Sequence, residues 1–296
     1  MTSKKIKIIL IFFLSIFSFF INKHYANLGM EPMDTFVLYN GGYKVLNGLI
    51  PFKDYWLTTG PLMDYINALF FSIGGVNWNT YIIHSSLFNV MITISTYLFL
   101  NILGLNKYYS FFFSLMFATL MYPVVGSPFV DHHSTIFVLL SFYFFIIGIS
   151  QENSKFFFYI PSILILAFLC KQTPAAYGIM IIFFLGILYL SCYQNKKEIF
   201  LNSLYGSILG ILILLTFLLL TKIPIKNFYI QYIAYGGSIG SYRLKHMEPD
   251  ILGIIHQYKF ILLPLLFSIL IFFKAKLIKN KKEILIFSSF IFLTLI

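Results

Sequence analysis

Three of the ten acidic residues, Asp34, Asp54 and Asp64, fall within one aromatic-rich stretch of the chain. A carboxylate acts as a general base when it lies within hydrogen-bonding distance of the proton that it removes. Asp34 precedes a short expected helix, so it is either such a base or the cap of a helix that starts at Thr35. Asp54 is typical of a turn and Asp64 of a first helical turn. Both stay candidates for contacts that support Asp34, and Asp54 is also a candidate for binding substrate.

A second cluster, Asp131-His132-His133, follows later in the chain. Aspartate and histidine together could bind a divalent metal ion, but neighbouring histidines point in different directions and the spacing supplies no further ligand. The favoured interpretation is that Asp131 caps a helix beginning near His133. Asp131 is also a candidate for substrate contact.

The composition indicates where these groups must be held. Of the 296 residues, 59% are hydrophobic and only 10% are charged, and the mean hydropathy is +0.86. A soluble domain carries about a quarter charged residues. The composition therefore excludes a soluble enzyme, a nucleic-acid binder and a disordered linker, and it predicts a multi-pass membrane protein.

Uncharged runs locate the membrane helices, since a crossing needs roughly 20 apolar residues. Gly74-Gly75 separates a full span from a shorter apolar helix near 62–73, which we expect at the membrane interface. The last run is short and ends without a polar tail, so we expect a fragment with a truncated C-terminus. The predicted fold is an all-α bundle with about nine spans, at 6–21, 81–103, 108–124, 134–150, 156–170, 174–193, 200–221, 255–273 and 284–296.

The distribution of lysine predicts the orientation, because cationic residues near spans are retained in the cytoplasm. A cytoplasmic N-terminus places twelve lysines and three acids inside, and nine cations and seven acids outside. The net charge of +11 is therefore explained by topology, and no nucleic-acid partner is needed. The long segments 22–80 and 222–254 then face outward from the cell membrane.

Three cations of the outer face are candidates for binding an anionic substrate. The run before Lys171, 156–170, gives only about 22 Å of helix, which leaves this lysine near the headgroups. There it contacts a lipid-borne phosphate or simply extends toward water, as membrane lysines commonly do. Arg243 and Lys245 lie in the glycine-rich stretch 235–246, for which we expect either a mobile loop over a lipid or a connector near anionic headgroups.

The block 33–65 resembles the GT-C membrane glycosyltransferases, and within them the protein O-mannosyltransferases and the lipid A aminoarabinose transferase. The family's catalytic aspartate follows the first membrane helix, a role that the resemblance transfers to Asp34. The family often has Asp-Glu where this chain has Asp34-Thr35, and Thr-Lys-Gly where it has Cys170-Lys171-Gln172. The matching residues are Asp34, Asn47-Gly48, Pro51-Phe52-Lys53-Asp54, Gly60-Pro61 and the segment Leu166-Ala167-Phe168-Leu169-Cys170-Lys171.

The resemblance implies one GT-C-like transmembrane domain over 1–296, with 22–80 as the catalytic outer loop and 222–254 as a second large outer loop. It implies an inverting transferase that moves a sugar from a polyprenyl-phosphate donor to a lipid, glycan or protein acceptor, with Asp34 as base. No cofactor is required, although a divalent cation stays an open alternative. The other functions are a lipid-linked glycan flippase or transporter and a glycan polymerase. A transporter places ionisable residues near helix centres, and the spans 108–124 and 200–221 contain none.

Overall fold

The computed structural model describes residues 3–29, 32–192, 196–247, 250–274 and 281–293. These residues form helices and turns, without a strand longer than an isolated bridge. The helices are α1 Ser3–Tyr25, α2 Pro32–Leu46, α3 Leu62–Gly74, α4 Trp78–Ile102, α5 Lys107–Leu120, α6 Val130–Ser150, α7 Phe156–Cys170, α8 Gln172–Cys192, α9 Lys196–Leu220, α10 Ile225–Phe228, the π-helix Tyr229–Ala234, α11 Tyr235–His246, α12 Ile251–Lys274 and α13 Lys281–Leu293.

Six helices are long and apolar enough to cross a membrane, namely α1, α4, α6, α8, α9 and α12. The prediction of an all-helical multi-pass membrane protein is therefore confirmed. α3 and α7 are apolar but shorter. Helices also cover parts of the predicted spans at 108–124 and 284–296, but the total of nine spans stays a prediction.

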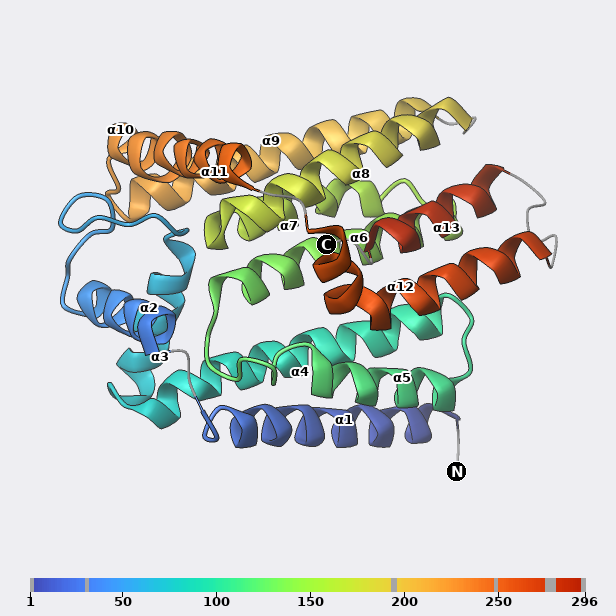
Figure 1. Ribbon diagram of the computed structural model, residues 1–296, viewed down its shortest axis with the longest axis horizontal. Coiled ribbons are helices and arrows are strands. Elements are labelled where there is room, and N and C mark those ends of the chain that lie inside the picture. Colours follow the sequence, from blue (N-terminus) through green and yellow to red (C-terminus); the bar gives the residue numbers. More distant parts are fainter. Residues whose placement is uncertain (1–2, 30–31, 193–195, 248–249, 275–280, 294–296) are drawn as a thin grey trace.

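The helices from α4 to α9 run back and forth along one axis, so alternate connections meet at the same end (Figure 1). At one end lie α2, α3 and α10, together with the connection 121–129 and the α7–α8 junction at Lys171 (Figure 1). We call this the polar end. The opposite end holds the short connections 103–106 and 151–155. Segments that the charge pattern assigns to one face of the membrane thus lie at one end of the bundle.

The break between α3 and α4 lies where the glycines predict it. Gly75 has a positive φ of 76°, which glycine adopts at little cost, and its N–H bonds the carbonyl of Phe71 to end α3. Asn77 then begins α4, because its side chain accepts a hydrogen bond from the N–H of Thr80. The short helix expected near 62–73 is therefore present, as Leu62–Gly74.

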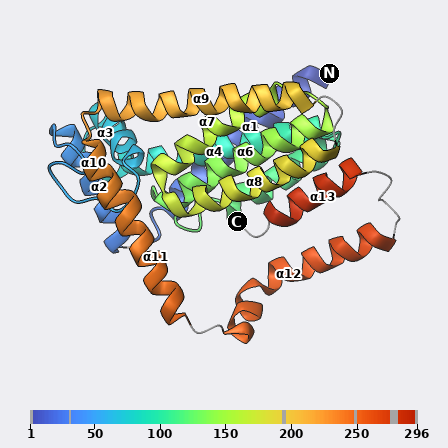
Figure 2. The same ribbon diagram turned by 90° about the horizontal axis from the view of Figure 1, so that it is seen from above.

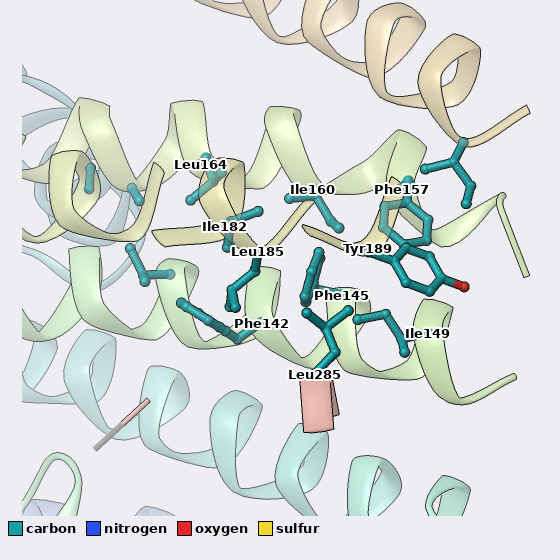
Figure 3. Packing of buried hydrophobic residues seen from close by; sticks show 14 residues of the cluster. Phe142, Phe145, Ile149, Phe157, Ile160, Leu164, Ile182, Leu185, Tyr189 and Leu285 are labelled. Atoms are coloured by element: carbon teal, nitrogen blue, oxygen red, sulfur yellow. The ribbon is translucent and has the colours of Figure 1, made fainter. Parts of the chain in front are cut away.

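An apolar core joins α6, α7 and α8 in the middle of the bundle (Figure 3). The ring of Phe145 from α6 lies against that of Phe157 from α7, which in turn stacks on the ring of Tyr189 from α8. Close approach of α9 to α7 requires Gly206, because a Cβ there would collide with the Phe158 carbonyl. Between helices in lipid, such tight contacts supply much of the association energy.

The chain leaves this bundle after α9. Figure 2 shows α10 and α11 leading away from it and α12 lying apart from the other helices. The apolar stretch of α12 has no residue that is buried by the other described parts of the chain. Long apolar side chains on such a helix are suited to contact with lipid.

Candidate functional site

Asp34 lies at the polar end, in the first turn of α2. The helix begins at Pro32, so the alternative in which Asp34 caps a helix starting at Thr35 is wrong. Its side chain is exposed, and among the described residues it has no hydrogen-bond or ion-pair partner. The helix dipole favours a negative charge in the first turn. Asp34 is therefore a carboxylate that is open to an incoming group.

The start of α2 is fixed to the connection that leads into α6. The hydroxyl oxygens of Thr35 and Ser127 lie 3.2 Å apart and are buried. The Tyr81 hydroxyl lies 3.1 Å from the Thr35 carbonyl oxygen and 3.3 Å from that of Pro128. These contacts bring the residue next to Asp34 within hydrogen-bonding reach of a segment three residues before Asp131. The two predicted acidic regions are thus joined.

Asp131 is paired with Lys171, a contact between residues 40 positions apart. The Lys171 Nζ lies 2.6 Å from the Asp131 carboxylate, and both side chains are about one-third exposed. A pair so open to solvent contributes under about 1 kcal/mol to stability. The expectation that Asp131 caps a helix beginning near His133 is wrong, because α6 begins at Val130 and Asp131 lies in its first turn.

Three helix N-termini meet around this ion pair. The N–H of Gly60, which precedes α3, donates to the carbonyl of Cys170 at 2.9 Å. In the first turns of α6, the Ser134 hydroxyl is 3.1 Å from the carbonyl of Lys171, directly before α8. A Cβ at Gly60 would collide with the backbone of Leu169, so only glycine permits this approach. Helix N-termini carry partial positive charge, so α3, α6 and α8 together favour an anion here.

The first long segment is clamped to the residues after α9. Phe52 has a positive φ of 64°, and its carbonyl accepts hydrogen bonds from Asn227 at 2.9 Å and Gln231 at 3.0 Å. The side-chain Oε1 of Gln231 accepts a hydrogen bond from the N–H of Leu57 at 3.1 Å. Gln231 lies in the π-helix, a form that often marks functional sites. No sequence pattern singled out Asn227 or Gln231.

Asp54 has the turn role expected for it. Its Oδ2 accepts a hydrogen bond from the N–H of Ile50 at 2.7 Å, and the side chain is exposed. The geometry closes the turn that carries Phe52 and leads to Gly60. Contact between Asp54 and a substrate stays a prediction.

Asp64 differs from the other acids of this end because it is buried. Its Oδ2 accepts from the Tyr55 hydroxyl at 2.7 Å, while its Oδ1 has no partner among the described residues. Burial raises the pKa of this carboxyl to about 7, against the lowering effects of the Tyr55 hydrogen bond and the Lys44 charge. A Cβ at Gly41 would collide with the carboxylate, so this glycine is required by packing. No local sequence pattern indicates that Asp64 is buried.

Arg243 and Lys245 lie on α11 and are exposed. The prediction of a glycine-rich loop over 235–246 is wrong, because this stretch is helical. The helix continues from the π-helix, and Gly236 packs against Gln172, which donates to the carbonyls of Thr58 and Tyr232. The cations lie in the last turn, where they complement the helix dipole.

The structure separates the residues of the Asp131-His132-His133 cluster. Asp131 pairs with Lys171, whereas His133 is buried against Tyr122 and His84. Within the described ranges, no group of three or more His, Cys, Asp or Glu side chains could hold a metal ion.

Comparison with known proteins places the chain in no family: no protein-family model, curated protein or solved structure matches it significantly.

Proposed function

We propose that this chain is a membrane glycosyltransferase of the GT-C type, which transfers a sugar from a polyprenyl-phosphate donor to a hydroxyl acceptor. One observation carries the proposal. An exposed carboxylate, Asp34, lies on a helix fixed to the segment that leads into the Asp131–Lys171 pair. A base and an anion-binding position on one end of a bundle are the two groups that such a transfer needs.

The chemistry follows from these roles. Asp34 takes the proton from the acceptor hydroxyl while the oxygen of that hydroxyl attacks the anomeric carbon of the sugar. The bond between that carbon and the phosphate oxygen breaks, and the polyprenyl phosphate leaves with the electron pair. Lys171 and the N-termini of α3, α6 and α8 stabilise the negative charge on the departing phosphate. Attack from the face opposite the phosphate inverts the anomeric centre.

In the proposed sequence of binding, the donor phosphate competes with Asp131 for Lys171. The Asp131–Lys171 ion pair is about one-third exposed and therefore weak. A phosphate can replace Asp131 there, because it offers more acceptor oxygens to the Lys171 ammonium. Arg243 and Lys245 are exposed near the end of α11, form no ion pair within the described residues, and would face anionic headgroups. Asp54 holds the turn that carries the clamped segment.

The proposed orientation puts the N-terminus in the cytoplasm and the polar end outside. Two serines test it, because Ser238 lies beyond α10 and Ser154 lies at the opposite end of the bundle. In a background without other cysteines, an impermeant thiol reagent should label Ser238→Cys in intact cells and Ser154→Cys only after permeabilisation. The reverse pattern would place the site on the cytoplasmic face.

Sugar transfer itself tests the function. Membranes enriched in the full-length protein are supplied with polyprenyl-phosphate sugars, and products are followed by mass spectrometry. We expect a new glycoside whose formation depends on both the protein and the donor. Movement of the donor between leaflets without a new glycosidic bond would instead identify a flippase. Glycolipids and glycans of a deletion strain then identify the missing sugar.

A further inference from the structure

A chain of buried polar side chains joins α3, α4 and α6 and reaches α2, the helix that carries Asp34. The Asn67 amide lies 2.7 Å from Nδ1 of His84, and Nε2 of His84 lies 2.9 Å from Nε2 of His133. Nδ1 of His133 lies 2.8 Å from the Tyr122 hydroxyl. All four side chains are fully buried. They come from α3, α4, α6 and the start of the connection between α5 and α6.

Asn67, the member of this series on α3, determines the direction of all its hydrogen bonds. The Asn67 Nδ2 donates to the carbonyl of Leu38 on α2 at 3.2 Å, so its Oδ1 faces His84 and can only accept. His84 must therefore carry its proton on Nδ1. A neutral His84 then has a bare Nε2, which requires a proton on Nε2 of His133.

The other end completes the same order. A neutral His133 with its proton on Nε2 has a bare Nδ1, which accepts from the Tyr122 hydroxyl. The Tyr122 oxygen in turn accepts from the N–H of Phe129 at 3.1 Å. The reverse order would let Nδ1 of His133 donate to the Phe129 carbonyl, also 3.1 Å away, although this carbonyl already accepts the backbone N–H of His133 and needs no second donor. That order leaves two acceptors facing each other at Asn67 and Leu38, a costly arrangement in a buried site.

We propose that His84 and His133 are positioning residues: their ordered hydrogen bonds hold Asn67 in place, and Asn67 fixes α2 through the Leu38 carbonyl. Leu38 is one helical turn beyond Asp34 on α2, and Tyr81 holds the Thr35 carbonyl on the same helix. The chain thus connects the start of α6, which carries Asp131, to the helix that carries Asp34. Its relevance to catalysis rests on the proposed function, whereas its existence does not.

Histidine tautomers test the chain directly, because protonated and bare ring nitrogens give separate nitrogen-15 signals. The full-length protein is labelled with nitrogen-15 on its six histidines. The signals of His84 and His133 are assigned by their loss in His84→Gln and His133→Gln. We expect the proton on Nδ1 of His84 and on Nε2 of His133. A proton on Nδ1 of His133, or a charged ring at either position, would overturn the proposal.

Asn67→Leu is the discriminating variant, because it removes the group that sets the order. His84 then loses its acceptor at Nδ1, and the reverse order becomes the satisfied one through the Phe129 carbonyl. We expect both histidines to change tautomer together. Asn101→Leu is the matched control, since the Asn101 amide donates to the Tyr97 carbonyl within α4 and lies outside this series of hydrogen bonds, and it should change neither. A change at His84 alone would show that the two rings are not coupled.

Hydrogen exchange tests the positioning without any assay of transfer. The amides of α2 should exchange roughly fivefold faster in Asn67→Leu, as expected for the loss of one net hydrogen bond, and at the wild-type rate in Asn101→Leu. Unchanged exchange in α2 would reduce the chain to local packing. If the wild type transfers sugar, Asn67→Leu should lower kcat by about 10- to 100-fold with little change in the donor KM, because Asp34 is misplaced. Absence of transfer by the wild type would contradict the proposed function and leave the tautomer and exchange results standing.

Discussion

The two ends of the bundle reverse the chain in different ways. At the end opposite to the polar end, short turns satisfy themselves: Asn106 accepts from the N–H of Tyr108, and Asn153 from that of Lys155. At the polar end, side chains bond backbone groups far along the chain, as Asn227 and Gln231 do at Phe52. Long-range bonds of this kind position segments relative to one another, whereas short turns only connect helices. The difference indicates that the polar end is the one whose segments are held in a fixed arrangement.

The polar end also contains three aspartates in three different environments. Asp34 is open, Asp131 is paired with Lys171, and Asp64 is buried with an unpartnered oxygen, all within the polar end. Three carboxyls in three environments have different tasks available to them. An exposed carboxylate can take a proton from a substrate, a paired one can be displaced by a phosphate, and a buried one responds to pH.

The largest expected change in stability separates the core from the site. Phe142→Ala removes a fully buried ring from the α6–α7–α8 core (Figure 3). We expect a loss of about 3 kcal/mol of stability, the lower end of the usual range because the separated helices also lie in lipid. Thermal unfolding in detergent measures it, with Phe183→Ala, whose side chain is 69% exposed, as the control. Transfer per folded molecule should stay near that of wild type, and a specific loss of transfer would contradict the division into core and site.

The next effect concerns the Asp131–Lys171 pair. Lys171→Ala should weaken donor use by roughly 1.5–3 kcal/mol, the contribution of a hydrogen bond to a charged group. Lys171→Arg should keep part of the activity. Asp131→Asn removes the competing carboxylate, so we expect donor use to be kept or improved. Equal donor affinity in Lys171→Ala and wild type would show that this lysine only extends toward water.

A third effect, a change of stability with pH, concerns Asp64. Its pKa is raised to about 7 in the folded protein, from an ordinary value of 3.8. The folded state therefore binds the proton more tightly than the unfolded state, and its stability falls as pH rises between about 4 and 7. Asp64→Asn cannot ionise, so its Tm should vary less over this range. Unfolding curves at pH 5 and 8 measure the difference, and an equal pH dependence in both proteins would contradict it.

Much of the fold could be predicted from local pattern. The uncharged runs give the helices, and Gly75 with Asn77 gives the break between α3 and α4, because each depends on residues close in sequence. The glycine-rich stretch 235–246 is helical although its composition predicts a loop, because contacts with Gln172 and continuity with the π-helix override the low helix propensity of glycine. The sequence predicts helix starts at Thr35 and near His133, whereas α2 begins at Pro32 and α6 at Val130, so Asp34 and Asp131 lie in first turns and are not caps.

The site could be predicted only in part. Asp34, Asp131 and Lys171 are singled out by residue type and position, but their pairing depends on how α6 and α7 meet. The burial of Asp64, the clamp by Gln231 and the His84–His133 contact all join residues that no spacing relates. A single sequence carries no local signal for such contacts, because they are set by packing between distant helices.

Sugar transfer by Asp34→Asn tests the central claim most directly. The amide preserves the size and polarity of the side chain on the first turn of α2 but cannot accept a proton at neutral pH. Asp54→Asn is the matched control, because Asp54 is an exposed turn residue of the same long segment. We expect Asp34→Asn to reach normal abundance and Tm while transfer falls at least about 100-fold, and Asp54→Asn to fall far less. Near-normal transfer by a well-folded Asp34→Asn protein would contradict the account.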